Sequence, residues 1–481
     1  MKRTETMPER AEMAVAGLGV MGANLALNIE EQGFPVAVWN RNAEKTHAFL
    51  QQHGGKRFAG AESLEELIAL LAPPRRILIM VKAGPPVDSM IEQLAPRLET
   101  GDILIDGGNS HFRETARRNR RLEEQGIGFV GLGVSGGESG ARHGPSLMPG
   151  GPRPAYEKLQ PILERIAAKS DSGPCVAWLG PGGAGHFVKT VHNAIEYGIM
   201  QLLAEAYDLL RRGAGLEVAA IADLFGRWNN EILSSFLTDL TAKVLRVTDP
   251  QSGKPLVEMI LDEAGQKGTG RWAGQDALDL GVPVPTIMAA LFARNISAMK
   301  NERLQAARII AGPETTAFKG DTERLIAAVR AALVAATVCT YAEGMTLIAK
   351  ASDEYDWQVE LAETARIWKA GCIIRSGLLD PMMKAFAGQP DLANLLLDKN
   401  MRKLVESHQE GWRRAMGLAA ELGIPLPATG AALAYFDSYR SAVLPQKLTQ
   451  AQRDAFGAHT YRRLDDPDGE SIHTEWTTGG N

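Results

Sequence analysis

Short apolar runs alternate with amphipathic segments between residue 13 and about residue 180. The runs MAVAGLG, VAVWN, RILIMVKAG, DILIDGGNS and GFVGLGVSGG have the length of β-strands and lead into turns, most of them rich in glycine. The segments between them, such as residues 64–71, repeat their apolar positions with the period of an α-helix. This alternation predicts a doubly wound α/β domain, built on a parallel sheet, over residues 1–184.

The pattern changes after residue 184. Residues 185–443 have long helical periods rich in alanine and leucine and few strand signals, which predicts a large all-helical domain. Residues 444–481 are polar, with prolines and charges. We expect them to form an extended C-terminal tail that would be mobile by itself.

The segment HFVKTVHNAIEYG reads as a helix whose polar side chains share one face. At about 100° per residue, Lys189, His192, Asn193, Glu196 and Tyr197 form one stripe, whereas the other faces are apolar. A largely apolar helix does not need five aligned hydrogen-bonding groups for packing. The stripe therefore predicts one wall of a binding site.

A short internal match pairs MQLLAEAYD (200–208) with MTLIAKASD (345–353). Either two related halves of the helical domain or chance in alanine- and leucine-rich helices explains a match of this length. In this register Lys189 and Glu196 correspond to Val334 and Tyr341, so the second copy lacks the stripe. This favours a local role for the stripe over a shared structural one.

Composition and charge narrow the functional classes. The chain has 481 residues, 45% of them hydrophobic and 23% charged, with a net charge of −5 and both signs interspersed. This disfavours a nucleic-acid or membrane-binding surface. The cysteines Cys175, Cys339 and Cys372 are far apart and show no metal-ligand spacing, so we expect buried thiols and no metal. The polar start MKRTETMPER lacks an apolar core, which favours a cytoplasmic protein over a secreted one.

A glycine motif follows the first predicted strand. Gly17, Gly19 and Gly22 have the spacing GxGxxG and stand between a strand and a helix, with Leu18, Val20 and Met21 in the same turn. In that context glycines permit a tight turn and close approach to a pyrophosphate at the helix N-terminus. The motif predicts a Rossmann-like nucleotide site, whereas a glycine-rich turn without a ligand is the simpler alternative.

The end of the second predicted strand indicates which nucleotide binds. An NAD site usually has an acidic residue there, for the ribose 2′-hydroxyl. This chain has Asn40, Arg41 and Asn42, with Lys45 nearby. A guanidinium can pair with a 2′-phosphate, so we predict NADP over NAD, the alternative being that Arg41 is a solvated loop charge.

The motifs together identify a family. In order, they are GLGVMGANLALNI, NRN, MVKAG, DGGNSHFRET, GVSGGESGARHGPSLMPGG, FVKTVHNAIEYG, GQKGTGRW, ARNISAMK and RDAFGAHTY. Over residues 13–476 the chain resembles the long, decarboxylating, NADP-dependent 6-phosphogluconate dehydrogenases. The resemblance implies oxidative decarboxylation of 6-phospho-D-gluconate to D-ribulose 5-phosphate and carbon dioxide with reduction of NADP, in the pentose phosphate pathway or in gluconate utilization.

The resemblance also implies residue roles. Lys189 would be the general base and acid, and Glu196 would protonate carbon 1 of an enediol. The implied cofactor loop is Val81, Lys82 and Ala83, and Asn109 would lie between substrate and nicotinamide. The implied substrate-binding residues are Asn109, Ser135, Gly136, Gly137, His192, Asn193, Tyr197, Lys267, Arg294, Arg453 and His459.

The last two of these residues lie in the tail, which in this family inserts into the other subunit. The resemblance therefore implies a homodimer with shared active sites, either alone or paired into a tetramer. The chain departs from the family at Asn42, where threonine is usual, at Ala455, where an aromatic residue is usual, and at His143, where tyrosine is common. None of these departures removes an implied catalytic group.

Two other hypotheses compete. A β-hydroxyacid dehydrogenase of the 3-hydroxyisobutyrate type shares the nucleotide motif, the glycine-rich substrate loop and the helix lysine but is much shorter. A non-catalytic NADP-binding sensor on the same fold would be favoured by loss of Lys189 or Glu196, and both residues are present.

Overall fold

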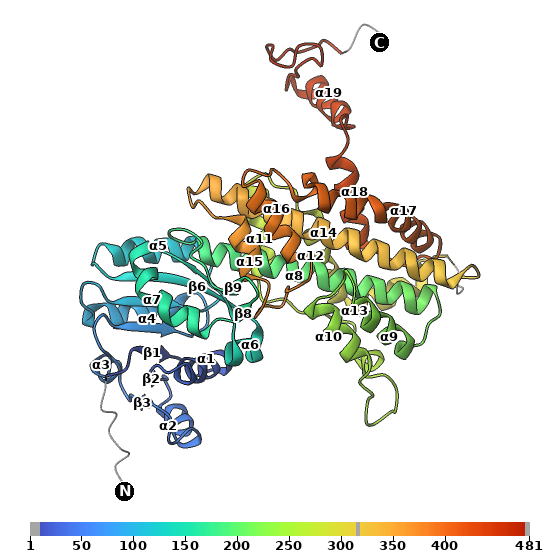
Figure 1. Cartoon of the computed structure of the whole chain (residues 1–481). Helices are drawn as coiled ribbons and strands as arrows, with labels where there is room; N and C mark the ends of the chain where they lie inside the picture. Colours follow the sequence, from blue (N-terminus) through green and yellow to red (C-terminus); the bar gives the residue numbers. More distant parts are fainter. Residues whose placement is uncertain (1–9, 314–317, 477–481) are drawn as a thin grey trace. The chain divides into compact units, whose positions relative to one another are not determined.

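The structure is a computed structural model that describes residues 10–313 and 318–476 (Figure 1). It divides into two compact units, Met1–Ala432 and Leu433–Asn481, which are described separately. The predicted domain boundaries after residues 184 and 443 stay predictions.

The first unit begins with a seven-stranded sheet in the order β3-β2-β1-β4-β5-β6-β7. All neighbouring pairs are parallel except β6 and β7, which are antiparallel. This confirms the predicted parallel sheet and adds an antiparallel edge strand. The strands are β1 (Met13–Ala16), β2 (Val36–Trp39), β3 (Phe58–Gly60), β4 (Arg76–Ile79), β5 (Ile103–Asp106), β6 (Gly128–Ser135) and β7 (Ser146–Gly150).

Helices cover both faces of this sheet. Successive residues of β1 point to opposite faces, so Val15 packs in one apolar cluster with Leu25 and Leu159, and Ala14 packs in another with Leu67. The doubly wound architecture is therefore confirmed. The helices of this region are α1 (Val20–Glu31), α2 (Ala43–Gln52), α3 (Leu64–Ala69), α4 (Pro85–Leu94), α5 (Phe112–Glu123), α6 (Gly137–His143) and α7 (Arg153–Ile166).

The strand order reverses at β1, which lies between β2 and β4. Ligands of open α/β sheets bind outside the carboxyl ends of the strands at such a switch point. The turns that follow β1, β4 and β5 begin at Gly17, Met80 and Gly107, so three loops meet at this edge.

A short hairpin, β8 (Lys169–Ser170) and β9 (Gly173–Pro174), leads into the predicted helical region. Its longest helix, α14, packs against α8 and α17. Within the described residues, α14 alone is long and apolar enough to cross a membrane, but 78% of its most apolar window is buried, as in a core helix. The helices are α8 (Ala184–Asp208), α9 (Val218–Trp228), α10 (Phe236–Leu245), α11 (Thr269–Asp279), α12 (Pro285–Ser297), α13 (Lys300–Ile309), α14 (Thr322–Glu354), α15 (Leu361–Ile367), α16 (Leu379–Gly388), α17 (Lys399–Glu421) and α18 (Pro427–Tyr439).

Two buried glutamates cap helices in a reciprocal way. Glu343 of α14 accepts hydrogen bonds from the backbone N–H and hydroxyl of Thr286, at the start of α12. Glu205 of α8 accepts the same two bonds from Thr429, at the start of α18. The capped helices follow the similar stretches LGVPVP and LGIPLP. These shared roles support two related halves.

The two glutamates also correct the register of the internal match. They make Glu205 equivalent to Glu343, whereas the Met200–Met345 match pairs Glu205 with Lys350, about two helical turns further on. In the corrected register Lys189 corresponds to Ala327 and not to Val334. The second half still lacks the polar stripe, so the earlier conclusion is unchanged.

The second unit contains the rest of α18 and the tail. The tail forms a helix, α19 (Gln446–Gly457), and the following chain folds back, so that the backbones of Tyr461 and Ile472 pair. Although the sequence suggests a mobile segment, this unit has regular structure of its own.

Candidate active site

A cavity of about 1290 Å³ lies where the carboxyl ends of the strands face α8. Residues from the sheet loops, from α8 and from the loop before α11 all contribute to its walls. It brings together most of the residues predicted from the sequence. These are Gly19, Val20, Met21, Gly22, Val81, Lys82, Ala83, Asn109, Ser135, Gly136, Gly137, Lys189, Asn193, Glu196, Tyr197, Lys267 and Arg294.

The glycine turn has the geometry of a dinucleotide site. Gly17 has a φ of +112°, which favours glycine, and a Cβ there would lie 2.4 Å from the carbonyl oxygen of Met80. A Cβ on Gly22 would lie 1.9 Å from the carbonyl oxygen of Gly17, whereas Gly19 faces open space. The first turn of α1 carries no acidic residue. The turn therefore leaves room and free backbone donors for a pyrophosphate.

The end of β2 is tied to this turn. The Oδ1 atom of Asn40 accepts a hydrogen bond from the backbone N–H of Leu18 at 3.0 Å. Asn42 caps α2, because its Oδ1 atom accepts from the backbone N–H of Glu44 at 2.9 Å. Arg41 is exposed between them. The cap occupies the Asn42 oxygen, so the amide nitrogen is the part of Asn42 that can donate to a phosphate.

A buried network holds the loop that carries Asn109. Asp106 accepts hydrogen bonds from the backbone N–H of Gly108 (3.0 Å) and the hydroxyl of Ser110 (2.6 Å). Buried Arg118 donates to Asp88 (2.7 Å) and to the carbonyl oxygen of Gly84, at the end of the predicted cofactor loop. Since the Nη1 atom of Arg118 also donates to Asp106 at 3.5 Å, one guanidinium joins two loops that line the cavity.

Close packing against glycines positions α8. A Cβ on Gly133 of β6 would lie 2.6 Å from the Cβ of Lys189, and a Cβ on Gly185 of α8 would lie 2.3 Å from the carbonyl oxygen of Met148. The helix therefore lies almost directly on β6 and β7. Lys189 is only 6% exposed and points into the cavity.

The polar stripe forms a connected set of hydrogen bonds. The Nζ atom of Lys189 donates a hydrogen bond to the Oδ1 atom of Asn193. His192 bonds the same oxygen through Nδ1 at 3.2 Å and contacts the Ser135 hydroxyl through Nε2 at 3.1 Å. His192 does not line the cavity itself, so it links the glycine-rich substrate loop to the stripe.

Burial drives the two candidate catalytic groups toward their neutral forms. It lowers the pKa of Lys189, although the nearby carboxyl of Glu196 opposes this shift. It raises the pKa of Glu196, against the positive charges of Lys189 and Arg294. Burial, followed by the charge of Lys189, lowers the pKa of His192 well below its usual value. A neutral amine and a protonated carboxyl are the forms that a base and an acid need.

Cationic groups lie at the other end of the stripe. The guanidinium carbon of Arg294 lies 3.5 Å from the ring centre of Tyr197, and its Nη1 atom donates to the carbonyl oxygen of Gly265 at 3.0 Å. Lys267 follows in the same loop and is exposed. The positive charges at this end of the stripe suit a phosphate. The other end suits the reacting carbon atoms of a substrate, since Lys189 and Glu196 are two helical turns apart there.

Some lining residues were not predicted. They are Met80, Gly107, Gly108, Val134, Met200, Gly265, Gln266, Thr269, Trp272 and Ile373. Several belong to motifs already noted, DGGNS and GQKGTGRW, and Met200 continues the period of the stripe but is apolar. Ile373 gave no signal, because its contact with the cavity depends on the tertiary fold.

The segment around Ile373 forms a floor beneath the substrate loop. The carbonyl oxygen of Gly371 accepts from the backbone N–H of Ser146 at 2.8 Å, and a Cβ on Gly136 would lie 2.5 Å from that oxygen. Buried Tyr341 donates to the carbonyl oxygen of Ile374 at 2.6 Å. The segment is thus fixed to both the sheet domain and α14.

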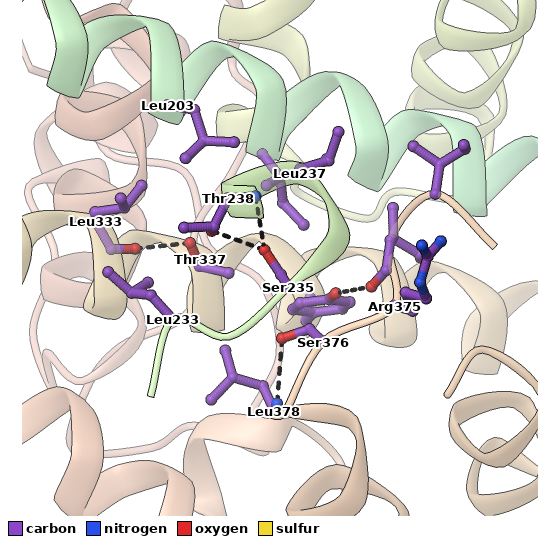
Figure 2. A pocket seen from close by; sticks show the side chains of 14 residues that line it. Leu203, Leu233, Ser235, Leu237, Thr238, Leu333, Thr337, Arg375, Ser376 and Leu378 are labelled. Carbon is purple, nitrogen blue, oxygen red and sulfur yellow. Dashed lines mark hydrogen bonds between the residues drawn. The ribbon is translucent and has the colours of Figure 1, made fainter. Parts of the chain in front are cut away.

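A much smaller cavity, of about 20 Å³, lies on the other side of this segment (Figure 2). Its walls are mainly aliphatic and include Leu203, Leu333 and Leu378, with the Ser235 and Thr238 hydroxyls hydrogen-bonded to each other at 2.7 Å. Ile373 separates it from the large cavity, since it lines both. The small cavity has room for about one water molecule.

The remaining predicted residues lie elsewhere. Arg453 and His459 belong to the second unit. In the described parts of the chain, no cluster of three or more potential metal-ligand side chains is found. A glycine turn at the switch point of a Rossmann-like sheet, facing a lysine and a glutamate on a helix that packs against the sheet, is typical of the class of dinucleotide-dependent dehydrogenases.

Comparison with known proteins identifies the family within this class. Residues 12–180 match the model of the NAD binding domain of 6-phosphogluconate dehydrogenase, and residues 185–476 match that of its C-terminal domain. The decarboxylating 6-phosphogluconate dehydrogenase of Synechococcus elongatus is 55% identical over 97% of this chain and 99% of that protein. The NADP(+)-dependent, decarboxylating enzyme of Bacillus subtilis is 51% identical over 97% and 99%.

A solved structure agrees. Plasmodium falciparum 6-phosphogluconate dehydrogenase, studied in its apo form and in complex with NADP+ and with 6-phosphogluconate, has a TM-score of 0.93 and 39% identity, covering 97% of this chain and 100% of that one. The chain belongs to the 6-phosphogluconate dehydrogenase family. The resemblance seen in the sequence is confirmed.

Proposed function

We propose that this chain catalyses the oxidative decarboxylation of 6-phospho-D-gluconate to D-ribulose 5-phosphate and carbon dioxide, with reduction of NADP. The observation that carries the proposal is the face of α8, which presents Lys189 and Glu196 to a cavity shared with the glycine turn. The match of residues 185–476 to the C-terminal domain of the family favours this reaction over that of the shorter 3-hydroxyisobutyrate type.

The first step needs a base. Neutral Lys189 takes the proton of the substrate's 3-hydroxyl group, and the carbon–hydrogen bond at carbon 3 breaks at the same time. NADP, held by the glycine turn after β1, would supply the acceptor for the hydride that leaves carbon 3. A lysine at its usual pKa would be protonated at neutral pH, so the burial that lowers the pKa of Lys189 is a requirement of this step.

The next steps need acids. Lys189, now an ammonium, polarises the 3-keto group while the bond between carbon 1 of the acid and carbon 2 breaks and carbon dioxide leaves. The electron pair moves toward the keto oxygen, which receives the Lys189 proton and gives an enediol. Glu196 then protonates the new terminal carbon, which is carbon 1 of the product, while neutral Lys189 takes back the proton of the enol hydroxyl, which becomes the keto group of the product. Burial raises the pKa of Glu196, which favours the protonated form that this step needs.

The substrate roles are those that the family resemblance implies, and all of the following residues except His192 line the cavity. Ser135, Gly136 and Gly137 would hold the carboxylate end, and Asn109 would lie between substrate and nicotinamide. His192 and Asn193 would bond the hydroxyl groups. Tyr197, Lys267 and Arg294 would bind the phosphate.

The direct test measures both products. Purified protein is incubated with NADP and 6-phosphogluconate, and NADPH and carbon dioxide are followed together, with equal amounts expected. Release of carbon dioxide without NADPH, or formation of neither, would overturn the proposal and favour a sensor. Turnover of unphosphorylated 3-hydroxy acids at similar kcat/KM would favour the 3-hydroxyisobutyrate type.

We further infer a homodimer in which each tail completes the partner's site. Large apolar side chains are exposed along α12 and α13, among them Phe292 (53%), Ile296 (56%) and Ile309 (82%), as expected of a covered face. Sedimentation would show a dimer or a tetramer. Mixed dimers of Lys189→Ala and Arg453→Ala subunits should regain activity, because one site then has both groups intact.

Cytoplasmic location is the last part of the proposal. The cysteines Cys175, Cys339 and Cys372 are all free and buried, as is usual in a reducing compartment. Fractionation of cells that express the full chain would test this location.

A further inference from the structure

One carboxylate in the tail is buried, although most of the side chains around it are exposed. Asp454 is 0% exposed, and it is the only buried residue of α19, whose other side chains face outward or lie partly covered. A lone buried carboxylate is costly unless hydrogen bonds compensate for the lost water. The hydrogen-bond partners of Asp454 therefore indicate which contacts hold the tail together.

Four donors converge on Asp454. Its Oδ1 atom accepts from the backbone N–H of Thr460 at 2.8 Å and from Nδ1 of His473 at 2.9 Å. Its Oδ2 atom accepts from the backbone N–H of Thr474 at 3.0 Å and from Nε1 of Trp476 at 2.7 Å. Burial opposes the charge, but these bonds outweigh it and lower the pKa of Asp454. The charged carboxylate thus joins α19 to chain segments that follow it.

Neighbouring contacts hold the two predicted site residues of the tail. Arg453 immediately precedes Asp454, and its Nη1 atom donates to Gln450, whose amide donates to the carbonyl oxygen of Thr460. His459 lies between Ala458 and Thr460, which have φ values of 50° and 57°. Residues other than glycine rarely adopt this left-handed backbone conformation, so it needs support from hydrogen bonds such as the one from Thr460 to Asp454.

We propose that Asp454 is a positioning residue that orders the tail before it docks and holds Arg453 and His459 in a fixed arrangement. Residues 473–476 act on the active site through this carboxylate, and Thr474 and Trp476 also contact Tyr461. The inference rests on the proposed role of the tail in substrate binding. A segment that is already ordered loses less conformational freedom on binding, so the effect should fall on substrate affinity.

The test uses two independent changes. Asp454→Asn keeps the shape of the side chain but replaces one acceptor oxygen with a donor. Truncation after Ile472 removes the donors of His473, Thr474 and Trp476 without altering α19. Each should raise KM for 6-phosphogluconate about tenfold or more, as expected for loss of hydrogen bonds to a charged group, while kcat and the KM for NADP change little.

The combination of the two changes separates positioning from general damage. If Asp454 acts with the residues after 472, the double variant should be no worse than either single one, because both remove the same interaction. Asp465→Asn is the matched control, since Asp465 pairs with Arg463 on the exposed surface of the same tail and should leave KM unchanged. Unchanged KM in Asp454→Asn, or full additivity with the truncation, would overturn the inference.

Mixed dimers separate this inference from the proposed function. Regained activity from Lys189→Ala with Arg453→Ala subunits, together with wild-type KM in Asp454→Asn, would leave the shared site standing and remove the role of Asp454. A tenfold rise in KM for Asp454→Asn without regain in the mixed dimers would retain Asp454 and remove the shared site.

Discussion

The contact between Gly133 and Lys189 allows a quantitative prediction. A Cβ placed on Gly133 would lie 2.6 Å from Cβ and 3.0 Å from Cγ of Lys189, and 3.1 Å from Cβ of Met148. Carbon atoms pack best at about 3.5–4.0 Å. In Gly133→Ala, therefore, β6 and the first turns of α8 must separate by about 1 Å, since the nearest atoms belong to the stem of Lys189 and not to a flexible end.

A shift of this size should affect catalysis more than folding. A misplacement of about 1 Å of a catalytic group can cost about 100-fold in rate. Added volume in a packed interior costs about 1–3 kcal/mol of unfolding free energy. We expect kcat to fall about 100-fold, while most of the protein stays folded and KM for NADP changes less than about threefold, because the glycine turn after β1 is not displaced.

The assay combines initial rates of NADPH formation with urea unfolding monitored by tryptophan fluorescence. Gly417→Ala is the matched control: Gly417 lies in α17, and a Cβ placed on it would face open space, so the same added methyl group should leave kcat unchanged and raise stability by about 0.5–1 kcal/mol. Wild-type kcat in folded Gly133→Ala would refute the reasoning that close packing against β6 positions Lys189.

Three further predictions concern protons, charge and capping. As pH increases, kcat should rise when Lys189 loses its proton, at a pH below the usual lysine pKa, and fall when Glu196 loses its proton, at a pH above the usual glutamate pKa. Glu196→Gln should slow the final protonation and remove the alkaline limb of this profile. Persistence of that limb at full turnover would contradict the acid role. Arg41→Asp should reverse the preference for NADP over NAD, measured as the ratio of kcat/KM values, whereas an unchanged ratio would make Arg41 a solvated charge. Glu343→Ala should lower the unfolding free energy by about 2–4 kcal/mol in urea titrations, because it leaves the buried donors of Thr286 without an acceptor; an unchanged midpoint would show that the cap is not needed.

The elements that sequence reasoning located were those with a local signal. The strand before Gly17 and the helix that carries Lys189 have strong periodicity, and a binding face was recognisable because five polar groups shared one side of an apolar helix. The clustering of Lys267 and Arg294 with that face followed from family motifs and not from spacing, since they come from separate elements.

Other features depend on contacts between distant segments. Ile373 lines the cavity only because Tyr341 and Ser146 fix the segment around it. The register of the internal match differed from that of the helix caps because alanine and leucine recur at many helical offsets, whereas the equivalence of Glu205 and Glu343 rests on which helix each one caps. The role of Asp454 likewise required the return of the chain from residue 473.

The exchanged glutamate caps make the helical region resemble two subunits joined in one polypeptide. Each half supplies a hydrogen-bond acceptor to the other. An isologous contact of a twofold dimer has the same pattern, because residue i of one copy meets residue j of the other, and residue j of the first meets residue i of the second. A chain cut between α13 and α14 would leave each fragment with a glutamate side chain that has lost its partner and a helix start that has lost its cap. Such fragments should therefore assemble together or not fold at all, which would make the helical region one cooperative folding unit that cannot be divided between its two halves.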